Sequence, residues 1–190
     1  MIELVQHMTP STPARQDALT LARAGSKAAF EQLVVENERL VLRAAWRLLG
    51  RREDARDAAQ EVFLRLYKNL GKLRDDTSIE AWLYRVTVNV CQDIRRKGGF
   101  PAQEFNDQSH ATAPGFDQAI DSEQQKSALM ELVSNLPDKE RAALVLRELE
   151  GLSTREVAGI LGSSEVTVRS QIFSARAKLK TWISERRTPR

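Results

Sequence analysis

Residues 153–183 contain two amphipathic patterns on either side of a glycine, and this arrangement leaves few folds open to the chain. Ser153 and Glu156 have the spacing of a capping box, which predicts the start of a helix. Gly162 predicts the end of that helix, because glycine adopts the positive φ that such a turn requires. Either of the next two serines can cap a second helix. The apolar positions of this second helix form one stripe, namely Val168, Ile172, Ala175 and Leu179.

The two expected helices have the pattern of a helix-turn-helix. Two helices that cross steeply need a small residue at their closest approach, and Ala158 is placed for this role. Gly162 occupies the turn, and Val168 is placed to seat the second helix. Residues 163–190 hold seven Lys and Arg residues against two acidic residues. An ordinary helical hairpin with a solvated basic face is the alternative, but the spacing and the charge together favour DNA binding.

The whole sequence predicts an all-α protein, because strand-like alternation is absent and glycine and proline cluster at the ends of helical patterns. With 190 residues, of which 42% are apolar, the chain can form one or two small domains with a buried core. The net charge is only +3, so the basic residues matter through their location rather than their number.

The single cysteine, Cys91, excludes an internal disulfide and fits a reducing compartment. It lies in a largely apolar helical pattern, so we expect a buried structural thiol rather than a redox group. The sequence has no N-terminal signal pattern, and no apolar run approaches the roughly 20 residues of a spanning helix. We therefore expect a cytoplasmic protein without a membrane-inserted segment.

Helical periodicity and its interruptions divide the chain into four parts. They are a frayed arm (1–13), a first helical domain (14–97), a flexible acidic linker (98–121) and a second helical domain that contains the helix-turn-helix (122–186). The linker differs in composition from both domains, because residues 100–121 hold two prolines, four acidic residues and no Lys or Arg. We expect the linker to act through charge and reach rather than through a fold.

The first domain is expected to contain helices over 16–24, 26–50, 53–70 and 77–97. Ser26 and Gly50 predict the two ends of the second of these helices. Thr77 and Glu80 have the spacing of another capping box. The sequence therefore predicts that Thr77 caps the fourth helix.

An acidic cluster lies at the start of the third expected helix and comprises Glu53, Asp54, Asp57 and Glu61. Asp57 and Glu61 are one turn apart, as metal ligands or an acid–base pair would be. However, no histidine is near them in sequence, and the helix dipole alone favours acidic residues in a first turn. A solvated face and a protein-docking surface are the other interpretations. The accompanying Phe63 and Tyr67 favour the docking surface over catalysis.

The fourth expected helix carries a second face, formed by Trp82, Arg85, Asn89 and Arg96. Such a face suits single-stranded nucleic acid, because arginine meets phosphate, an aromatic ring stacks on bases and an amide reads a base edge. Equally, Trp82 can belong to the core and the arginines can be solvated. The residue pattern alone leaves these two interpretations open.

Three stretches together resemble the bacterial extracytoplasmic-function (ECF, group IV) sigma factors of the sigma-70 family. They are AAFEQLVVENERLVLRAAWRLLGRREDARDAAQEVFLRLYKNL, SIEAWLYRVTVNVCQDIRRK and LPDKERAALVLRELEGLSTREVAGILGSSEVTVRSQIFSARAKL. DAAQEVF with WLYR downstream is the specific part of this resemblance, which covers residues 27–179 apart from the linker. One departure is Ile79 in LRDDTSIEAW, where the family often has a Gly or Ser pair with an aromatic residue.

The resemblance implies a promoter-specificity subunit of RNA polymerase. Such a protein binds core polymerase through the β′ and β subunits, recognises the −10 and −35 promoter elements and helps to melt DNA. It uses no cofactor or metal and is not an enzyme itself. The resemblance also implies an anti-sigma factor as a partner. The alternative is a free-standing helix-turn-helix regulator whose first domain senses a ligand or a partner.

The resemblance also assigns roles to residues. The surface for core polymerase comprises Asp57, Gln60, Glu61, Val62 and Phe63. The surface for the −10 element comprises Arg74, Asp75, Asp76, Thr77, Ser78, Trp82, Arg85, Asn89 and Arg96. The surface for the −35 element comprises Ser164, Glu165, Thr167, Arg169, Ser170, Phe173, Arg176 and Lys180. The linker would pass through the active-site cleft and the RNA exit channel, where its charge would mimic RNA.

Overall fold

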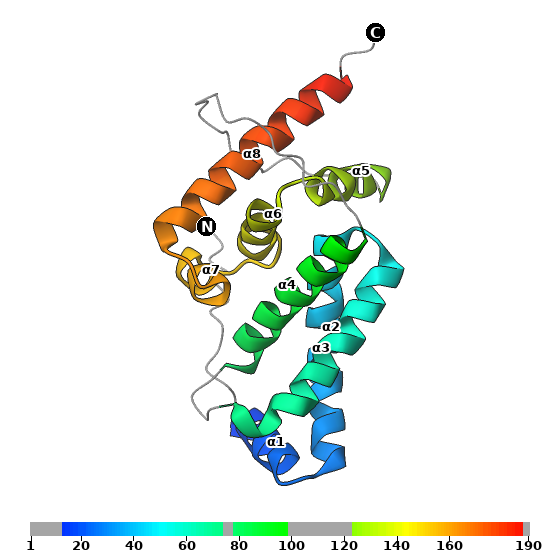
Figure 1. The fold of residues 1–190 in the computed structure, drawn as a ribbon, viewed down its shortest axis with the longest axis vertical. Helices are drawn as coiled ribbons and strands as arrows, with labels where there is room; N and C mark the ends of the chain where they lie inside the picture. The colour runs from blue at the N-terminus through cyan, green and yellow to red at the C-terminus, as the bar shows by residue number, and fades with distance from the viewer. Residues whose placement is uncertain (1–12, 74–77, 99–122, 188–190) are drawn as a thin grey trace, which may run out of the picture.

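The computed structural model describes residues 13–73, 78–98 and 123–187, and its regular elements there are all helical (Figure 1). In chain order they are α1 (Pro13–Arg23), α2 (Lys27–Leu49), α3 (Arg52–Asn69), the 3₁₀ turn η1 (Leu70–Lys72), α4 (Ile79–Lys97), α5 (Glu123–Ser134), α6 (Asp138–Leu144), the π-helical turn η2 (Val145–Leu149), α7 (Thr154–Leu161) and α8 (Glu165–Arg187). The expectation of an all-α fold is confirmed. Residues 1–12 of the expected arm, and the expected linker beyond Gly98, lie outside the described residues.

Local capping determines the two ends of α2. The Ser26 hydroxyl accepts a hydrogen bond from the backbone N–H of Ala29 at 3.3 Å. Gly50 has a φ of 76°, and its N–H donates to the carbonyl of Trp46 at 2.7 Å. Both predicted ends of this helix are confirmed. The preceding helix begins at Pro13, earlier than expected, and proline suits a first position because that N–H has no helical partner.

The start of α4 differs from the prediction. Its N-cap is Ser78 and not Thr77, because the Ser78 hydroxyl accepts from the backbone N–H of Ala81 at 3.3 Å. Glu80 then has the wrong spacing to bond back to the backbone of the cap, and its carboxylate instead accepts from the Ser78 hydroxyl at 3.0 Å. Adjacent threonine and serine both suit an N-cap, so the sequence signal was ambiguous by one position. Thr77 itself lies outside the described residues.

Helices α1 to α4 surround a common apolar core. α2 packs against α1, α3 and α4, and α3 packs against α4. The fully buried side chains of this core include Leu33, Val41, Val62, Leu66, Leu83 and Val90. Each helix buries one apolar stripe, which leaves the polar faces of α3 and α4 outside this core.

Helices α7 and α8 form the helix-turn-helix expected from the sequence. The Ser153 hydroxyl accepts from the N–H of Glu156 at 3.2 Å, and the Glu156 carboxylate accepts from the N–H of Ser153 at 2.7 Å. Gly162 ends α7 with a φ of 62°. Ser164 caps α8, since its hydroxyl accepts from the N–H of Thr167 at 3.1 Å. The predicted stripe of α8 is buried against α6 and α7, and consists of Val168, Ile172, Ala175 and Leu179.

The C-terminal helices pack directly on the N-terminal ones. α7 lies against α4, whereas α5 and η2 lie against α2. Figure 1 shows α6 and α7 alongside α4. In the described part of the chain, no helix is both long and apolar enough to cross a membrane.

Candidate polymerase and nucleic-acid interfaces

The outer face of α3 combines acidic and apolar side chains. Asp57 and Gln60 are exposed, whereas Glu61 and Phe63 are half-buried. Val62 is fully buried in the core, so it can support this surface only from beneath. Two exposed apolar residues extend it along the same helix: Tyr67, which the sequence analysis noted beside the acidic cluster, and Leu64, which it did not. The result is a mixed surface of the kind that suits protein docking.

An ion-pair chain orients one carboxylate of this face. Arg65 Nε donates to the Glu61 carboxylate at 2.7 Å, and Arg65 Nη2 lies 3.5 Å from the carboxylate of Asp93 on α4. The hydrogen bond to Glu61 raises the pKa of the Arg65 guanidinium. Within the described residues, no group of three or more His, Cys, Asp and Glu side chains is arranged to hold a metal ion. The ion pairs with Arg65 hold the Glu61 carboxylate in a defined orientation on this face.

The second face of α4 is accessible in part. Asn89 and Arg96 are exposed, and Arg96 forms an ion pair with Asp93. Trp82 is half-buried, so one part of its ring packs against the core and another part stays accessible. Arg85 reaches α7, where its Nε donates to the carbonyl of Ile160 at 3.1 Å and its Nη2 to that of Gly159 at 2.5 Å.

Of the remaining residues expected in the −10 surface, the structure describes only Ser78. Ser78 caps α4 and is half-buried, whereas residues 74–77 lie outside the described residues.

The N-terminal half of α8 presents polar side chains away from its buried stripe. Ser164, Thr167, Arg169 and Ser170 are exposed, and Glu165 lies 3.7 Å from the Arg169 guanidinium. Phe173 is 41% exposed, which leaves its ring free for apolar contact. Val166, which is 72% exposed, joins this surface although the sequence analysis did not select it.

Further along α8, the basic residues differ in how freely they can reach a phosphate. Lys180 is exposed. Arg176 is half-buried and lies 2.7 Å from the Glu148 carboxylate of η2. Lys178 also pairs inward, because its Nζ donates to the Glu140 carboxylate at 2.8 Å.

Two of the expected surfaces meet in one hollow between α4 and the helix-turn-helix. This hollow has a volume of about 270 Å³. Arg85 and Asn89 of α4 line it, together with Thr167 of α8. The fold therefore brings together residues predicted for the −10 element and a residue predicted for the −35 element.

Two family models match the chain, namely Sigma-70 region 2 over residues 33–100 and Sigma-70, region 4 over residues 126–179. The ECF RNA polymerase sigma factor SigM of Mycobacterium tuberculosis is 36% identical over 169 residues, which cover 87% of this chain and 83% of that protein. The chain belongs to the ECF sigma factors of the sigma-70 family.

Other relatives align with this sigma factor over similar lengths. The sigma-H factor of Pseudomonas aeruginosa is 31% identical over 172 residues, with 85% of this chain and 89% of that protein covered. The ECF sigma-E factor of Escherichia coli K12 is 32% identical over 163 residues. Among solved structures, CnrH in complex with the cytosolic domain of CnrY has a TM-score of 0.68 at 25% identity, covering 90% of this chain and 98% of that one. RpoE of Bartonella quintana shares the fold, with a TM-score of 0.62 at 21% identity.

Membership of this family determines the biochemical role of the chain. The sigma factor binds core RNA polymerase, directs it to promoters through the −10 and −35 elements and promotes DNA melting. Catalysis of RNA synthesis belongs to the polymerase, so the sigma factor is not an enzyme. The role of a free-standing helix-turn-helix regulator is thereby excluded.

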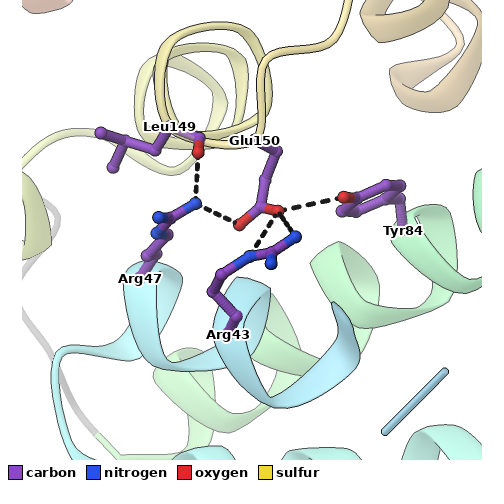
Figure 2. A network of polar contacts seen from close by, with 5 residues as sticks. All are labelled: Arg43, Arg47, Tyr84, Leu149 and Glu150. Carbon is purple, nitrogen blue, oxygen red and sulfur yellow. Dashed lines mark hydrogen bonds and ion pairs between the residues drawn. The ribbon is translucent and has the colours of Figure 1, made fainter. Parts of the chain in front are cut away.

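The sequence analysis missed a polar network that joins helices α2 and α4 to Glu150 in the C-terminal part of this sigma factor (Figure 2). The side chain of Glu150, which follows η2, is fully buried. Its carboxylate accepts from Arg43 at 2.8 and 3.1 Å and from Arg47 at 2.7 Å, both on α2. It also accepts from the hydroxyl of Tyr84 on α4 at 3.0 Å. Burial raises the pKa of Tyr84, and the hydrogen bond to Glu150 raises that of Arg43.

A second buried polar group lies where α4 meets α6. Arg95 Nε is 3.4 Å from the carboxylate of Asp138, which also pairs with the 2% exposed Arg141. Arg141 further donates to the carbonyls of Ser134 and Leu136, at 3.1 and 2.6 Å. Burial, together with the nearby Arg95, lowers the pKa of Arg141 to about 10, although Asp138 acts in the opposite direction.

Proposed function

We propose that this sigma factor works through three surfaces, one each on α3, α4 and α8. The observation that carries the proposal is that each of these helices buries an apolar stripe and presents polar side chains on another face. We further propose that residues 14–97 and 122–186 act as two units, with residues 98–121 as an acidic connection between them.

The α3 surface docks on core polymerase, at the clamp helices of the β′ subunit. Asp57, Gln60 and Glu61 supply the polar contacts, and Phe63 supplies apolar area beside them. The exposure of Asp57 and the orientation of Glu61 by Arg65 support this role. An ordered carboxylate loses little side-chain entropy when a basic partner binds.

The α4 surface holds the separated −10 strand. Trp82 offers the exposed part of its ring to an unstacked base, Asn89 reads a base edge, and Arg85 and Arg96 meet phosphates. The segment 74–78 completes this surface at the start of the helix. The half-buried position of Trp82 supports its role, because a ring that is anchored on one side is a rigid stacking platform.

The α8 surface enters the major groove of the −35 element. Residues near the N-terminus of a recognition helix reach furthest into the groove, so Glu165, Thr167 and Arg169 are placed for base edges. Ser164, Ser170 and Phe173 flank them, and Arg176 and Lys180 meet phosphates. The exposure of Arg169 and Lys180 supports these assignments.

The acidic connection passes through the active-site cleft and the RNA exit channel of the polymerase, which allows the second unit to reach the β subunit side of the upstream promoter. An anti-sigma factor is a further partner. RpoE of Bartonella quintana, which shares this fold, was solved in complex with the anti-sigma factor NepR, and this supports the proposal. We place the protein in the cytoplasm, at the nucleoid when it is bound to polymerase.

The α3 assignment is tested by the double variant Asp57→Ala and Glu61→Ala. We expect its affinity for core polymerase to fall about tenfold or more, because charged contacts at an interface centre are lost. A matched double variant, Glu31→Ala and Glu38→Ala, removes two exposed acidic residues from α2 instead. Fluorescence anisotropy with labelled sigma factor measures both affinities, and melting curves confirm that both variants fold. Equal affinities for the two variants would reject the docking assignment.

A further inference from the structure

An exposed apolar side chain lies in the first turn of α8. Val166 is 72% exposed, so it contributes little to the apolar core. Valine is also a weaker helix former than alanine, because its β-branched side chain is stiff in a helix. Neither the core nor the stability of the helix therefore accounts for a valine at this position.

The direction of Val166 follows from the periodicity of the helix. Successive residues turn by about 100°, so the buried stripe of α8, which includes Val168 and Leu179, lies roughly 200° around the helix from Val166. Val166 therefore points almost directly away from the core of the helix-turn-helix. In this motif the exposed face of the second helix lies in the major groove, and its N-terminal residues contact the base edges.

A second apolar side chain shares this direction. Phe173 is also exposed and lies about two turns beyond Val166, which places the two side chains within about 20° of each other around the helix. Ser170 lies between them, and its small side chain leaves both apolar groups accessible. Arg169 and Thr167 lie to either side of this line. The outermost line of α8 is therefore apolar at both ends and bordered by polar side chains.

The major groove offers one apolar feature to such a line, the C5-methyl group of thymine. The other groups there are hydrogen-bond donors and acceptors, and a valine side chain would desolvate them without replacing their hydrogen bonds. We propose that Val166 is a specificity-determining residue that packs against the methyl group of a thymine in the −35 element. The inference rests on the proposed placement of α8 in the major groove of that element.

Uracil in place of thymine tests the contact, because the two bases differ only in this methyl group. The probe is the upstream element that the parent holoenzyme selects from randomised duplexes, with its thymines replaced by uracil one at a time. We expect the parent holoenzyme to bind one of these duplexes about fourfold more weakly than the unmodified element, which is the value of one buried methyl group. The Val166→Ala holoenzyme should bind those two duplexes equally.

Two further variants control this measurement. Val35→Ala removes a valine of similar exposure, 74%, from α2, and its holoenzyme should respond to uracil as the parent does. Val166→Ile keeps an apolar β-branched side chain in place and should also keep the response. Alanine is a stronger helix former than valine, so Val166→Ala should stay folded, and thermal unfolding checks this.

Each outcome decides one part of the inference. The same uracil response in the parent and in Val166→Ala at every position would overturn it, as would a parent that responds at no thymine. Arg169→Ala and Arg176→Ala decide the placement of α8 separately. If both of these holoenzymes bind the upstream element as tightly as the parent does, the placement fails and the inference fails with it. If they bind more weakly while Val166→Ala keeps the parent response, only the thymine contact is wrong.

Discussion

Arg169 and Arg176 lie two turns apart on α8 but have different surroundings. The Arg169 side chain is 63% exposed and only 3.7 Å from Glu165, whereas that of Arg176 is 27% exposed and paired with Glu148. An arginine that pairs bidentately with guanine contributes about 1–3 kcal/mol of discrimination. We therefore expect Arg169→Ala to relax the preference at one or two adjacent base pairs of the −35 element. Selection from randomised upstream elements with each holoenzyme measures this preference.

Arg176→Ala serves as the comparison for that experiment. A phosphate contact carries no sequence information, so its loss should weaken binding to all sequences alike and lower the salt slope by about one. If the Arg169 variant enriches the same bases as the parent at every position, then the base contact must come from another polar residue of α8.

The buried thiol of Cys91 predicts how the stability of the fold depends on pH. The thiol is 2% exposed, and burial raises its pKa to about 12, with Arg141 and Arg95 acting in the opposite direction. The folded chain keeps the thiol proton up to a higher pH than the unfolded chain does. The protonated thiol therefore makes its full contribution to the free energy of unfolding below pH 9.0, the ordinary thiol pKa, and this contribution is lost as the pH rises towards 12. The free energy of unfolding should fall by about 1 kcal/mol more in the parent than in Cys91→Ala between pH 8 and pH 10.

Urea unfolding of both chains at the two pH values measures this difference. Ellman's reagent at pH 8 gives an independent reading, since it should react with Cys91 only in urea. Rapid reaction of the folded chain would show that the thiol is accessible.

At the scale of the element, two glycines of the helix-turn-helix make opposite predictions. A Cβ at either Gly159 or Gly162 would meet no atom within 4 Å, so only the backbone distinguishes them. Gly159 lies inside α7, and Gly159→Ala should stabilise the fold by about 0.5–1 kcal/mol. Gly162 has a φ of 62°, and Gly162→Ala should cost about 1–2 kcal/mol. Thermal unfolding of the two variants tests these signs, and a loss of stability in both would contradict the backbone argument.

Local signals in the sequence were enough to predict most helix ends. Ser26 and the Ser153–Glu156 pair predicted helix starts because an N-cap depends only on residues three positions apart. Gly162 predicted a helix end for an equally local reason. The error at Thr77 has the same origin, since Ser78 next to it offers an equivalent hydroxyl and burial of Ile79 in the core is not a local property.

The candidate site was predictable to a smaller extent. Helical spacing separated the polar faces of α3, α4 and α8 from their buried stripes. It could not assign Glu150, which contacts Arg43 from 107 positions away and Tyr84 from 66 positions away. Arg85 is exposed, as expected, but spacing could not reveal its acceptors, which are main-chain carbonyls of a helix more than 70 positions later. Such pairings depend on how helices pack, and no spacing rule contains that information.

At the scale of the whole molecule, the expected linker makes a prediction that does not depend on its conformation. Replacing Glu104, Asp107, Asp117 and Asp121 by Gln and Asn removes its charge and keeps its length. We expect the helical domains to stay folded and initiation to be impaired, because the acidic chain would no longer match a channel built for RNA. Abortive and full-length transcripts from one promoter, compared between parent and variant, measure the effect. Identical yields and ratios would mean that the linker is a passive tether.

The hydrogen bonds from Arg85 to α7 have a consequence for how promoter specificity can diverge. Their acceptors are carbonyl groups of the peptide backbone, which every amino-acid sequence supplies in the same place. The side chains that face DNA, such as Thr167 and Arg169, lie on the next helix. A chimera that carries the recognition helix of another sigma factor would thus keep this contact with α4 unchanged. Changes on the recognition helix can therefore alter the target sequence without removing the acceptors of these two hydrogen bonds.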